Sequence, residues 1–205
     1  MFLMRRPSRE RVLRWLDEQR RLPFSYADVG ALGRFVPDGF DCDRIRVRIG
    51  TGAEAFSAAR AALTAWKQFP SRMGVAFPGD DALAAGDVVA TLFRAGPVWS
   101  LNACRIVAVI DERDERGERF GFTYGTLTGH IEHGEERFLI ERDLADDSVW
   151  YELFCFSRPQ HPLAQITKPF VRWKQGRFRT LSGEAIRAAV AARLRQQQIL
   201  TEATR

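Results

Sequence analysis

The stretch Ser148-Val-Trp-Tyr-Glu-Leu-Phe-Cys-Phe156 decides the fold. It is rich in β-branched and aromatic residues, as strands are, and alternate side chains of a strand point to opposite faces. One face would carry Val149, Tyr151, Leu153 and Cys155, and the other Trp150, Glu152, Phe154 and Phe156. Both faces are largely apolar, whereas a sheet with one face in water alternates apolar and polar residues. We therefore predict a cover on the second face, formed by an amino-terminal helix, by residues 23–41 or by another subunit.

Similar runs precede this strand and predict an antiparallel sheet. They span residues 87–93, 102–110, 119–126 and 135–142 and are separated by short turns rich in Gly, Asp and charged residues. Short turns join antiparallel neighbours. Farther upstream, residues 44–49 alternate arginine with isoleucine or valine, which is typical of a half-buried strand with its arginines in water.

Three helices are predicted around these strands. Residues 8–21 carry an apolar stripe and end before Pro23. Thr51 and Glu54 have capping-box spacing, which predicts a helix from residue 51 to Phe69, just before a proline. The last helix is expected from Pro162 to about Gln196. Its buried stripe is predicted to contain Leu163, Ile166, Phe170, Trp173, Leu181 and Ala185, with bends at Pro169, Gly176 and Gly183.

This order of elements predicts an α+β fold, because helices and strands are segregated along the chain. A helix with an apolar stripe that follows a curved antiparallel sheet is expected to lie across the concave face of that sheet. We therefore expect a cavity between the sheet and the last helix.

Composition excludes several classes of protein. The 205 residues are 45% hydrophobic and 28% charged, which is typical of a folded domain and not of a disordered or collagen-like chain. No apolar run approaches the roughly 18 residues that a membrane-spanning helix needs. Arginines occur at positions 5 and 6, and no apolar stretch with a small-residue cleavage site follows. No secretion signal is visible, so we expect a cytoplasmic protein. The three cysteines are too widely spaced for a zinc or redox motif and are expected to be reduced.

Positive charge is concentrated at the two ends of the chain. Residues 1–22 carry a net charge of +4 and residues 168–205 carry +7, whereas the middle carries −6. The overall charge of +5 is therefore weak evidence for a nucleic-acid partner, and none is expected.

Several segments together resemble the uncharacterised domain-of-unknown-function family nineteen-ninety. They are residues 47–52, 61–66, 102–107, 120–130, 132–138, 149–150 and 156–159. The resemblance implies a START-like helix-grip fold, as in pollen allergens and polyketide cyclases, with a curved sheet of about six or seven strands around a long carboxy-terminal helix. Residues 1–22 fit less clearly, so we expect a helical appendage at 1–22 and a single domain at 23–205. The family supplies no reaction, and the catalytic residues remain unassigned.

The densest chemistry lies between Tyr124 and Glu135. His130, Glu132, His133 and Glu135 have donor types suited to a divalent metal. Alternate residues of a strand face opposite ways, however, so we favour a hairpin whose polar groups bind loop backbone and predict neither a metal nor a cofactor. A proton-transfer site, with His130 or Glu132 as base and Tyr124 as acid, is a further possibility.

Three more residues are candidates for ligand contacts. Arg105 and Arg158 lie in or beside strands, where each either pairs with an acid or a carbonyl group, or anchors an acidic ligand. Trp173 belongs to a segment that interleaves aromatic and basic residues, read either as a core stripe or as a patch for nucleic acid or anionic membrane.

The favoured function is binding of a small hydrophobic or amphipathic ligand in the expected cavity. The predicted contacts are Arg105, Tyr124, His130, Glu132, Arg158 and Trp173. One alternative is a cyclase, hydrolase or isomerase that uses Tyr124, His130 and Glu132 in the same cavity. Another is an interaction of the basic last helix with nucleic acid or an anionic membrane. A homo-oligomer is compatible with all three.

Overall fold

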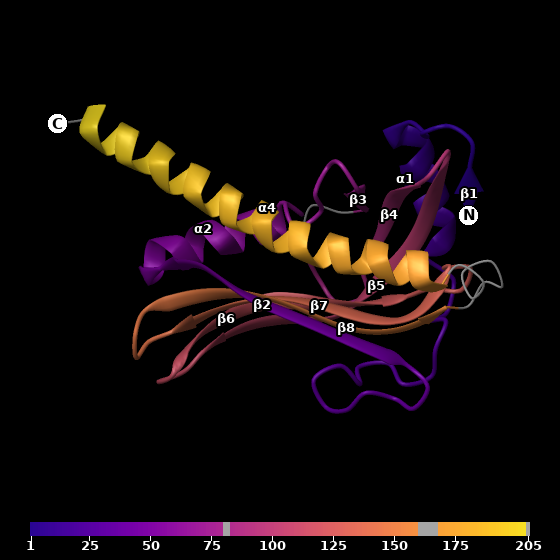
Figure 1. Ribbon diagram of the computed structural model, residues 1–205, viewed down its shortest axis with the longest axis horizontal. Coiled ribbons are helices and arrows are strands. Elements are labelled where there is room, and N and C mark those ends of the chain that lie inside the picture. Colours follow the sequence, from indigo (N-terminus) through magenta and orange to yellow (C-terminus); the bar gives the residue numbers. More distant parts are fainter. Residues whose placement is uncertain (80–82, 160–167, 204–205) are drawn as a thin grey trace.

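The computed structural model describes residues 1–79, 83–159 and 168–203 (Figure 1). Its eight-stranded antiparallel sheet has the order β2-β8-β7-β6-β5-β4-β3, with β1 paired to β5. The strands are β1 (Phe2–Leu3), β2 (Asp41–Thr51), β3 (Gly74–Pro78), β4 (Val88–Ala95), β5 (Val98–Arg113), β6 (Gly117–Thr126), β7 (Glu132–Asp143) and β8 (Ser148–Pro159). The helices are α1 (Arg9–Gln19), α2 (Gly52–Thr64) and α4 (Lys168–Ala203).

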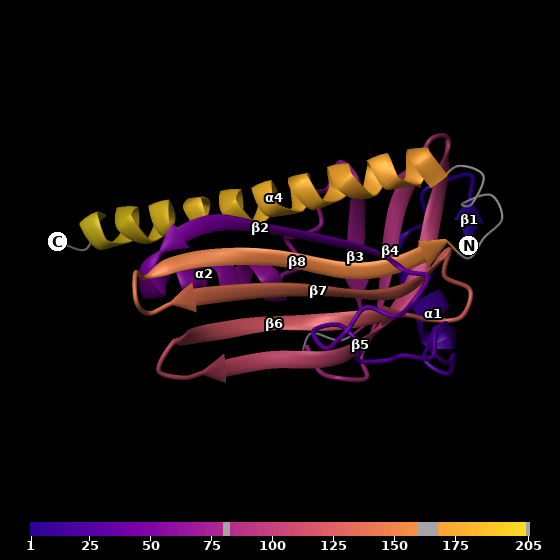
Figure 2. The same ribbon diagram turned by 60° about the horizontal axis from the view of Figure 1, so that its bottom comes forward.

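The sheet is strongly bent, and α2 and α4 lie on its concave face. Figures 1 and 2 show β3 and β4 standing steeply against the layer formed by β6, β7 and β8, and Figure 1 shows α4 running diagonally above this layer. The pairing register of β5 shifts between Ile106 and Ala108, and such irregularities increase the bend of a strand. The α+β helix-grip fold is thus confirmed. The sheet has eight strands instead of the predicted six or seven, because the short strand β1 also pairs with β5.

The two predicted faces of β8 are also confirmed. Val149, Tyr151 and Leu153 are fully buried in the concave core, together with residues of α2 and α4. The Tyr151 hydroxyl is 2.6 Å from the Ser182 hydroxyl of α4, so the last helix is tied to the sheet by a polar contact as well as by apolar packing.

Two of the predicted covers shield the other face, which we call the outer face. Val12 and Leu16 of α1 pack against β4 and β5. Residues 23–40, which we call the outer segment, bring Tyr26 and Leu32 onto Phe156 of β8. Because α1 contributes fully buried side chains, it is an integral part of the folded structure.

The arginines of β2 do more than face water. Arg44 and Arg46 lie on the outer face, and their side chains are about half exposed. Arg44 nevertheless pairs with Glu152, which is 1% exposed, and Arg46 pairs with Glu141. A buried carboxylate needs a cationic partner, so these arginines stabilise acidic residues on other strands. The alternation of residues 44–49 alone does not reveal these ion pairs.

Helix α2 departs from its prediction at both ends. The Thr51 side chain makes no capping hydrogen bond, so the predicted capping box is wrong. The helix ends at Thr64 instead of Phe69. Trp66 adopts a positive φ of 56°, and the right-handed α-helix requires a negative φ at every residue. The turn that follows places Trp66 and Phe69 against Phe122 and Phe138 of the sheet.

Helix α4 is unbroken from Lys168 to Ala203 despite Gly176 and Gly183, and the predicted start at Pro162 lies outside the described residues. Its buried stripe is displaced from the predicted one. The buried side chains recur every four residues and are Phe178, Ser182, Ile186 and Val190. Trp173 is 56% exposed, so its predicted burial is wrong, and Leu181 and Ala185 are half-buried. Leu163, Ile166 and the side chain of Phe170 are not among the described parts.

Candidate ligand cavity

A cavity of about 310 Å³ lies between the first half of α4 and the concave face of the sheet. Strands β4 to β8 supply its walls, and α4 supplies its cover. Its apolar lining includes Phe2, Met73, Phe93, Ile131 and Phe178. Its polar lining includes Thr91, Ser100, Asn102, Tyr124, Glu132, Glu136 and Gln175. A mostly apolar hollow with a few polar groups is the usual form of a small-molecule site.

Tyr124 and Glu136 form the central polar pair of this cavity. They are direct cross-strand partners on β6 and β7, and the Tyr124 hydroxyl donates to Glu136 Oε2 at 2.5 Å. Burial is the main cause that raises the pKa of Glu136 to about 7; the nearby Glu132 acts in the same direction, while the Tyr124 hydrogen bond and Arg179 oppose the shift. Burial also raises the pKa of Tyr124. The phenol therefore keeps its proton, and Glu136 can change charge near neutral pH.

Glu132 enters the same cavity from β7. Its Oε1 accepts a hydrogen bond from Gln175 Nε2 of α4 at 2.7 Å. Burial raises the pKa of Glu132, while the Gln175 hydrogen bond and the charges of Arg172 and Arg179 lower it. The cavity thus contains two carboxylates on one strand, and each accepts one hydrogen bond from a neutral side chain.

His130 is held as a neutral imidazole. The backbone N–H of Glu132 donates to His130 Nδ1 at 3.0 Å, and burial lowers the pKa of His130 to about 3. Because Nδ1 is occupied as an acceptor, the ring proton belongs on Nε2. His130 can therefore donate a hydrogen bond into the cavity but is a poor proton acceptor near neutral pH.

Polar contacts anchor the first half of α4 over the cavity. Arg172 and Arg179 both pair with Asp43 of β2, and the Lys174 ammonium donates to the Arg94 carbonyl oxygen at 2.8 Å. Several positive charges of this basic helix are thus engaged in contacts with the sheet, which leaves fewer of them for an external anion.

The cavity brings together three of the six predicted ligand contacts, namely Tyr124, His130 and Glu132. The other three lie elsewhere. Arg105 donates to the carbonyl oxygens of Arg20 and Leu22, which is the carbonyl-binding alternative of the prediction. The guanidinium of Arg158 stacks on Phe40 of the outer segment, 4.7 Å from the ring centre. Trp173 is not among the residues that line the cavity; it is exposed, and its ring contacts Arg177.

Sequence reasoning missed Glu136, Gln175 and Arg179. The usable signal for Glu136 was its spacing of four residues from Glu132, which puts both side chains on one face of a strand. Gln175 and Arg179 are likewise four residues apart on α4, and Phe178 lies between them on the cavity side. The buried face of α4 was predicted around other residues, so the position of Gln175 and Arg179 on the cavity side was not recognised.

The four proposed metal donors do not converge. Glu135 accepts hydrogen bonds from Tyr26 and from the backbone N–H groups of Gly30 and Leu32 in the outer segment, whereas Glu132 points into the cavity. No group of three or more potential metal ligands occurs within the described residues. The hydrogen bonds of Glu135 match the predicted hairpin whose polar groups bind loop backbone.

A bent antiparallel sheet that holds a long terminal helix over a mostly apolar cavity is a helix-grip architecture. The family model described as "Domain of unknown function (DUF1990)" matches residues 25–185. The chain belongs to this uncharacterised family, as the sequence resemblance implied. None of the helices within the described residues has the length and apolar character needed to cross a membrane.

Two relatives, each described as a "UPF0548 protein", come from a bacterium and a slime mould. A "UPF0548 protein" of Deinococcus radiodurans is 37% identical over 190 residues, covering 86% of this chain and 92% of the relative. A "UPF0548 protein" of Dictyostelium discoideum is 33% identical over 195 residues, covering 87% and 90%. Among solved structures, human STARD10 aligns with a TM-score of 0.46 and 11% identity, covering 95% of this chain and 84% of STARD10.

Proposed function

We propose that this protein binds a small hydrophobic or amphipathic molecule in the cavity beneath the first half of α4. The cavity itself carries the proposal. Its volume of about 310 Å³ lies at the lower end of the roughly 300–1,000 Å³ typical of ligand pockets. Packed interiors leave few voids larger than a water molecule, so a hollow of this size is best explained by an occupant.

The arrangement of polar groups supports an amphipathic ligand. Tyr124, Glu132 and Glu136 sit among aromatic and aliphatic side chains, so an apolar body could pack against Phe93 and Phe178 while a polar end meets the carboxylates. Buried polar groups orient a ligand, because leaving them without partners costs free energy.

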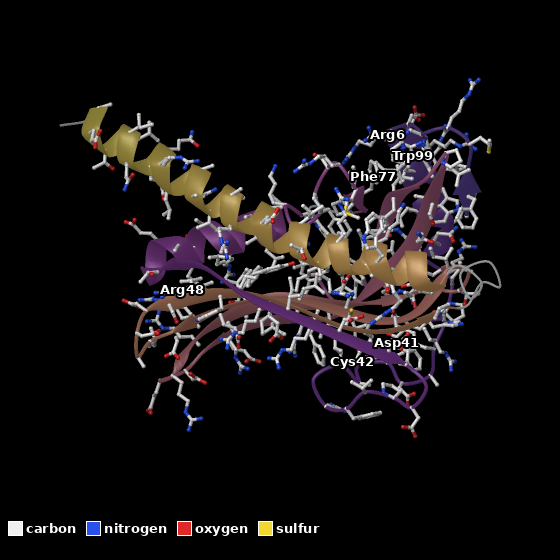
Figure 3. All side chains as sticks on the ribbon, in the orientation of Figure 1. Arg6, Asp41, Cys42, Arg48, Phe77 and Trp99 are labelled. Atoms are coloured by element: carbon white, nitrogen blue, oxygen red, sulfur yellow. The ribbon has the colours of Figure 1, made fainter. Side chains whose placement is uncertain are left out.

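A pair of cysteine variants tests the proposal. Cys155 lines the cavity, so Cys155→Phe should fill part of it. Cys42 is exposed, and Figure 3 places it on the side of the sheet away from α4, so Cys42→Phe is the matched control. The measurement is titration with an environment-sensitive apolar dye. We expect Cys155→Phe to weaken dye binding at least about tenfold, the effect of losing about 1.4 kcal/mol, and Cys42→Phe to leave it unchanged. Equal binding by both variants, or no saturable binding by the unmodified protein, would contradict the proposal.

A second candidate function is proton transfer at a carbon next to a carbonyl group. The specific observation is the Tyr124–Glu136 hydrogen bond inside the cavity. A base works best when its pKa is near the ambient pH, and the pKa of Glu136 is raised to about 7. Glu136 thereby replaces His130 and Glu132 as the better base, while Tyr124 can donate to a developing oxyanion.

Deuterium exchange tests this second function without a known substrate. The protein would be incubated in heavy water with simple apolar ketones, and uptake of deuterium beside the carbonyl would be followed by NMR. Acceleration that is lost in Glu136→Gln and Tyr124→Phe, with unchanged melting temperatures, would support an enzyme. Rates equal to those of the buffer would count against it while leaving ligand binding intact.

A further inference from the structure

The cavity has more hydrogen-bond acceptors than its surroundings satisfy. Glu136 Oε2 accepts a hydrogen bond from the Tyr124 hydroxyl, and Glu132 Oε1 accepts one from Gln175 Nε2. The second oxygen of each carboxylate has no hydrogen-bond partner within the described residues. Both side chains reach the cavity, so both oxygens are placed where a ligand can meet them.

An unpartnered amide oxygen adds a third acceptor. Gln175 Nε2 donates to Glu132 at 2.7 Å and approaches the Ser157 hydroxyl at 3.5 Å. The Gln175 oxygen is buried and has no hydrogen-bond partner within the part of the chain that the structure describes. Rotating the amide by half a turn would place this oxygen against the Glu132 carboxylate, so the carboxylate fixes its orientation. A buried acceptor without a donor costs free energy, which a donating ligand would recover.

The cations near the cavity are already engaged. Arg179 is paired with Asp43, and its side chain is only 13% exposed. The Lys174 ammonium donates to the backbone of Arg94, and the Arg94 guanidinium donates to the Gly96 carbonyl oxygen. An anionic ligand would compete with Asp43 for Arg179 and would face the negative charges of Glu132 and Glu136. A donor would instead meet carboxylate oxygens that have no partner within the described residues.

We propose that the ligand of this cavity carries a hydrogen-bond-donating, positively charged amine on an apolar body, and that Glu132 and Glu136 bind this amine with Gln175 as a third acceptor. This inference rests on the proposed ligand-binding function and specifies its ligand class. Burying a charge is costly unless it is paired, and an ammonium placed between two enclosed carboxylates would be paired. Charge-assisted hydrogen bonds of this kind are stronger than neutral ones.

Three probes that share an eight-carbon alkyl group test the charge preference of the cavity. Octylammonium, octanol and octanoate differ only in their polar end. Their binding to the full chain would be measured by displacement of the apolar dye at mildly alkaline pH. We expect octylammonium to bind at least about tenfold more tightly than octanoate, as a charge-assisted hydrogen bond allows, with octanol between them.

Glutamine variants test whether Glu132 and Glu136 cause the preference for the ammonium probe. Glu136→Gln and Glu132→Gln should each weaken octylammonium binding about tenfold and leave octanol binding unchanged. Glu115→Gln is the matched control, because Glu115 is exposed in the turn between β5 and β6. Two separate variants guard against one that fails to fold.

The outcomes distinguish this inference from the proposed function. If octanoate or octanol binds as tightly as octylammonium, or if both glutamine variants retain the ammonium preference, the amine inference is wrong while the cavity still binds ligands. If the dye and all three probes fail to bind the unmodified protein, the inference and the proposed function fail together.

Discussion

Glu135 and Glu136 are neighbours in the chain whose side chains make their hydrogen bonds on opposite faces of the sheet. Glu135 accepts from Tyr26, Gly30 and Leu32 on the outer face, and Glu136 accepts from Tyr124 on the concave face. The alternation of a strand thus gives two identical residues different environments: one carboxylate has three donors, and the other has one.

Replacing each glutamate by glutamine should separate these environments. In Glu135→Gln an amide NH₂ group would face a backbone N–H group that needs an acceptor, and Glu135 is only 2% exposed. We expect the free energy of unfolding to fall by about 2–3 kcal/mol, the range for hydrogen bonds to a charged group. Glu136→Gln should change stability by less than about 1 kcal/mol at neutral pH, because it removes a carboxylate that burial disfavours. Urea denaturation of both variants checks this, and similar losses in the two would contradict it.

The ionisation of Glu136 should make stability depend on pH. The titratable and charged groups around it are Cys104 on β5, Tyr124 on β6, Glu132 on β7, Tyr151 and Cys155 on β8, and Arg179 on α4. Its pKa is raised from 4.5 to about 7 in the folded protein. Between these values the folded protein keeps a proton that the unfolded chain has lost, so rising pH favours unfolding. The contribution of Glu136 should therefore fall by up to about 3 kcal/mol across this window, at about 1.36 kcal/mol per pKa unit.

A difference measurement isolates this contribution. His130 has a lowered pKa of about 3, so it destabilises the fold as pH falls below its ordinary value and partly masks the trend. Subtracting the free energy of unfolding of Glu136→Gln from that of the unmodified protein cancels the His130 contribution. We expect the difference to decline from about pH 4.5 to about pH 7. Parallel curves for the two proteins would show that Glu136 ionises normally, and Glu115→Gln should give such parallel curves.

The fold could be predicted from sequence because its strands carry strong local patterns. In β8, hydrophobic residues occupy every position from Val149 to Phe156 except Glu152. This pattern indicates that both faces of the strand are buried. The same logic predicted that α1 or the outer segment covers the second face. Period-two alternation is insensitive to errors of one or two residues at strand ends, because it depends on parity alone.

The cavity was predicted less completely, because its residues come from separate elements. The Tyr124–Glu136 pair depends on the register of β6 against β7, which a turn rich in glycine and threonine does not fix locally. The stripe of α4 was misplaced because aromatic and basic residues are interleaved over residues 170–179, so the apolar side chains do not mark a single face of the helix. The engagement of Arg105 with loop carbonyls required knowing where the chain passes after α1.

Asp43 should control how firmly the first half of α4 covers the cavity. It pairs with both Arg172 and Arg179, so Asp43→Ala removes two contacts at once and leaves Arg179 largely buried without its partner. We expect a loss of about 1 kcal/mol in global stability and faster amide hydrogen exchange across residues 172–181. Asp111→Ala is the control, because Asp111 pairs with Arg60 of α2 in an exposed bridge. Unchanged exchange in α4 of Asp43→Ala would show that apolar packing alone holds this half of the helix.

The two glycines of α4 should respond differently to alanine. Alanine favours a helix over glycine by up to about 1 kcal/mol. A Cβ at Gly176 would lie 3.7 Å from an Arg179 nitrogen, an ordinary contact, whereas a Cβ at Gly183 would lie 3.0 Å from Val47 Cγ2 on β2. Gly176→Ala should therefore raise the free energy of unfolding by about 0.5–1 kcal/mol. Gly183→Ala should gain nothing or lose stability, since the stiff, β-branched Val47 must move. Denaturant titration of both variants provides the measurement. Equal stabilisation by the two would mean that α4 can shift away from β2 without cost, which the close approach at Gly183 argues against.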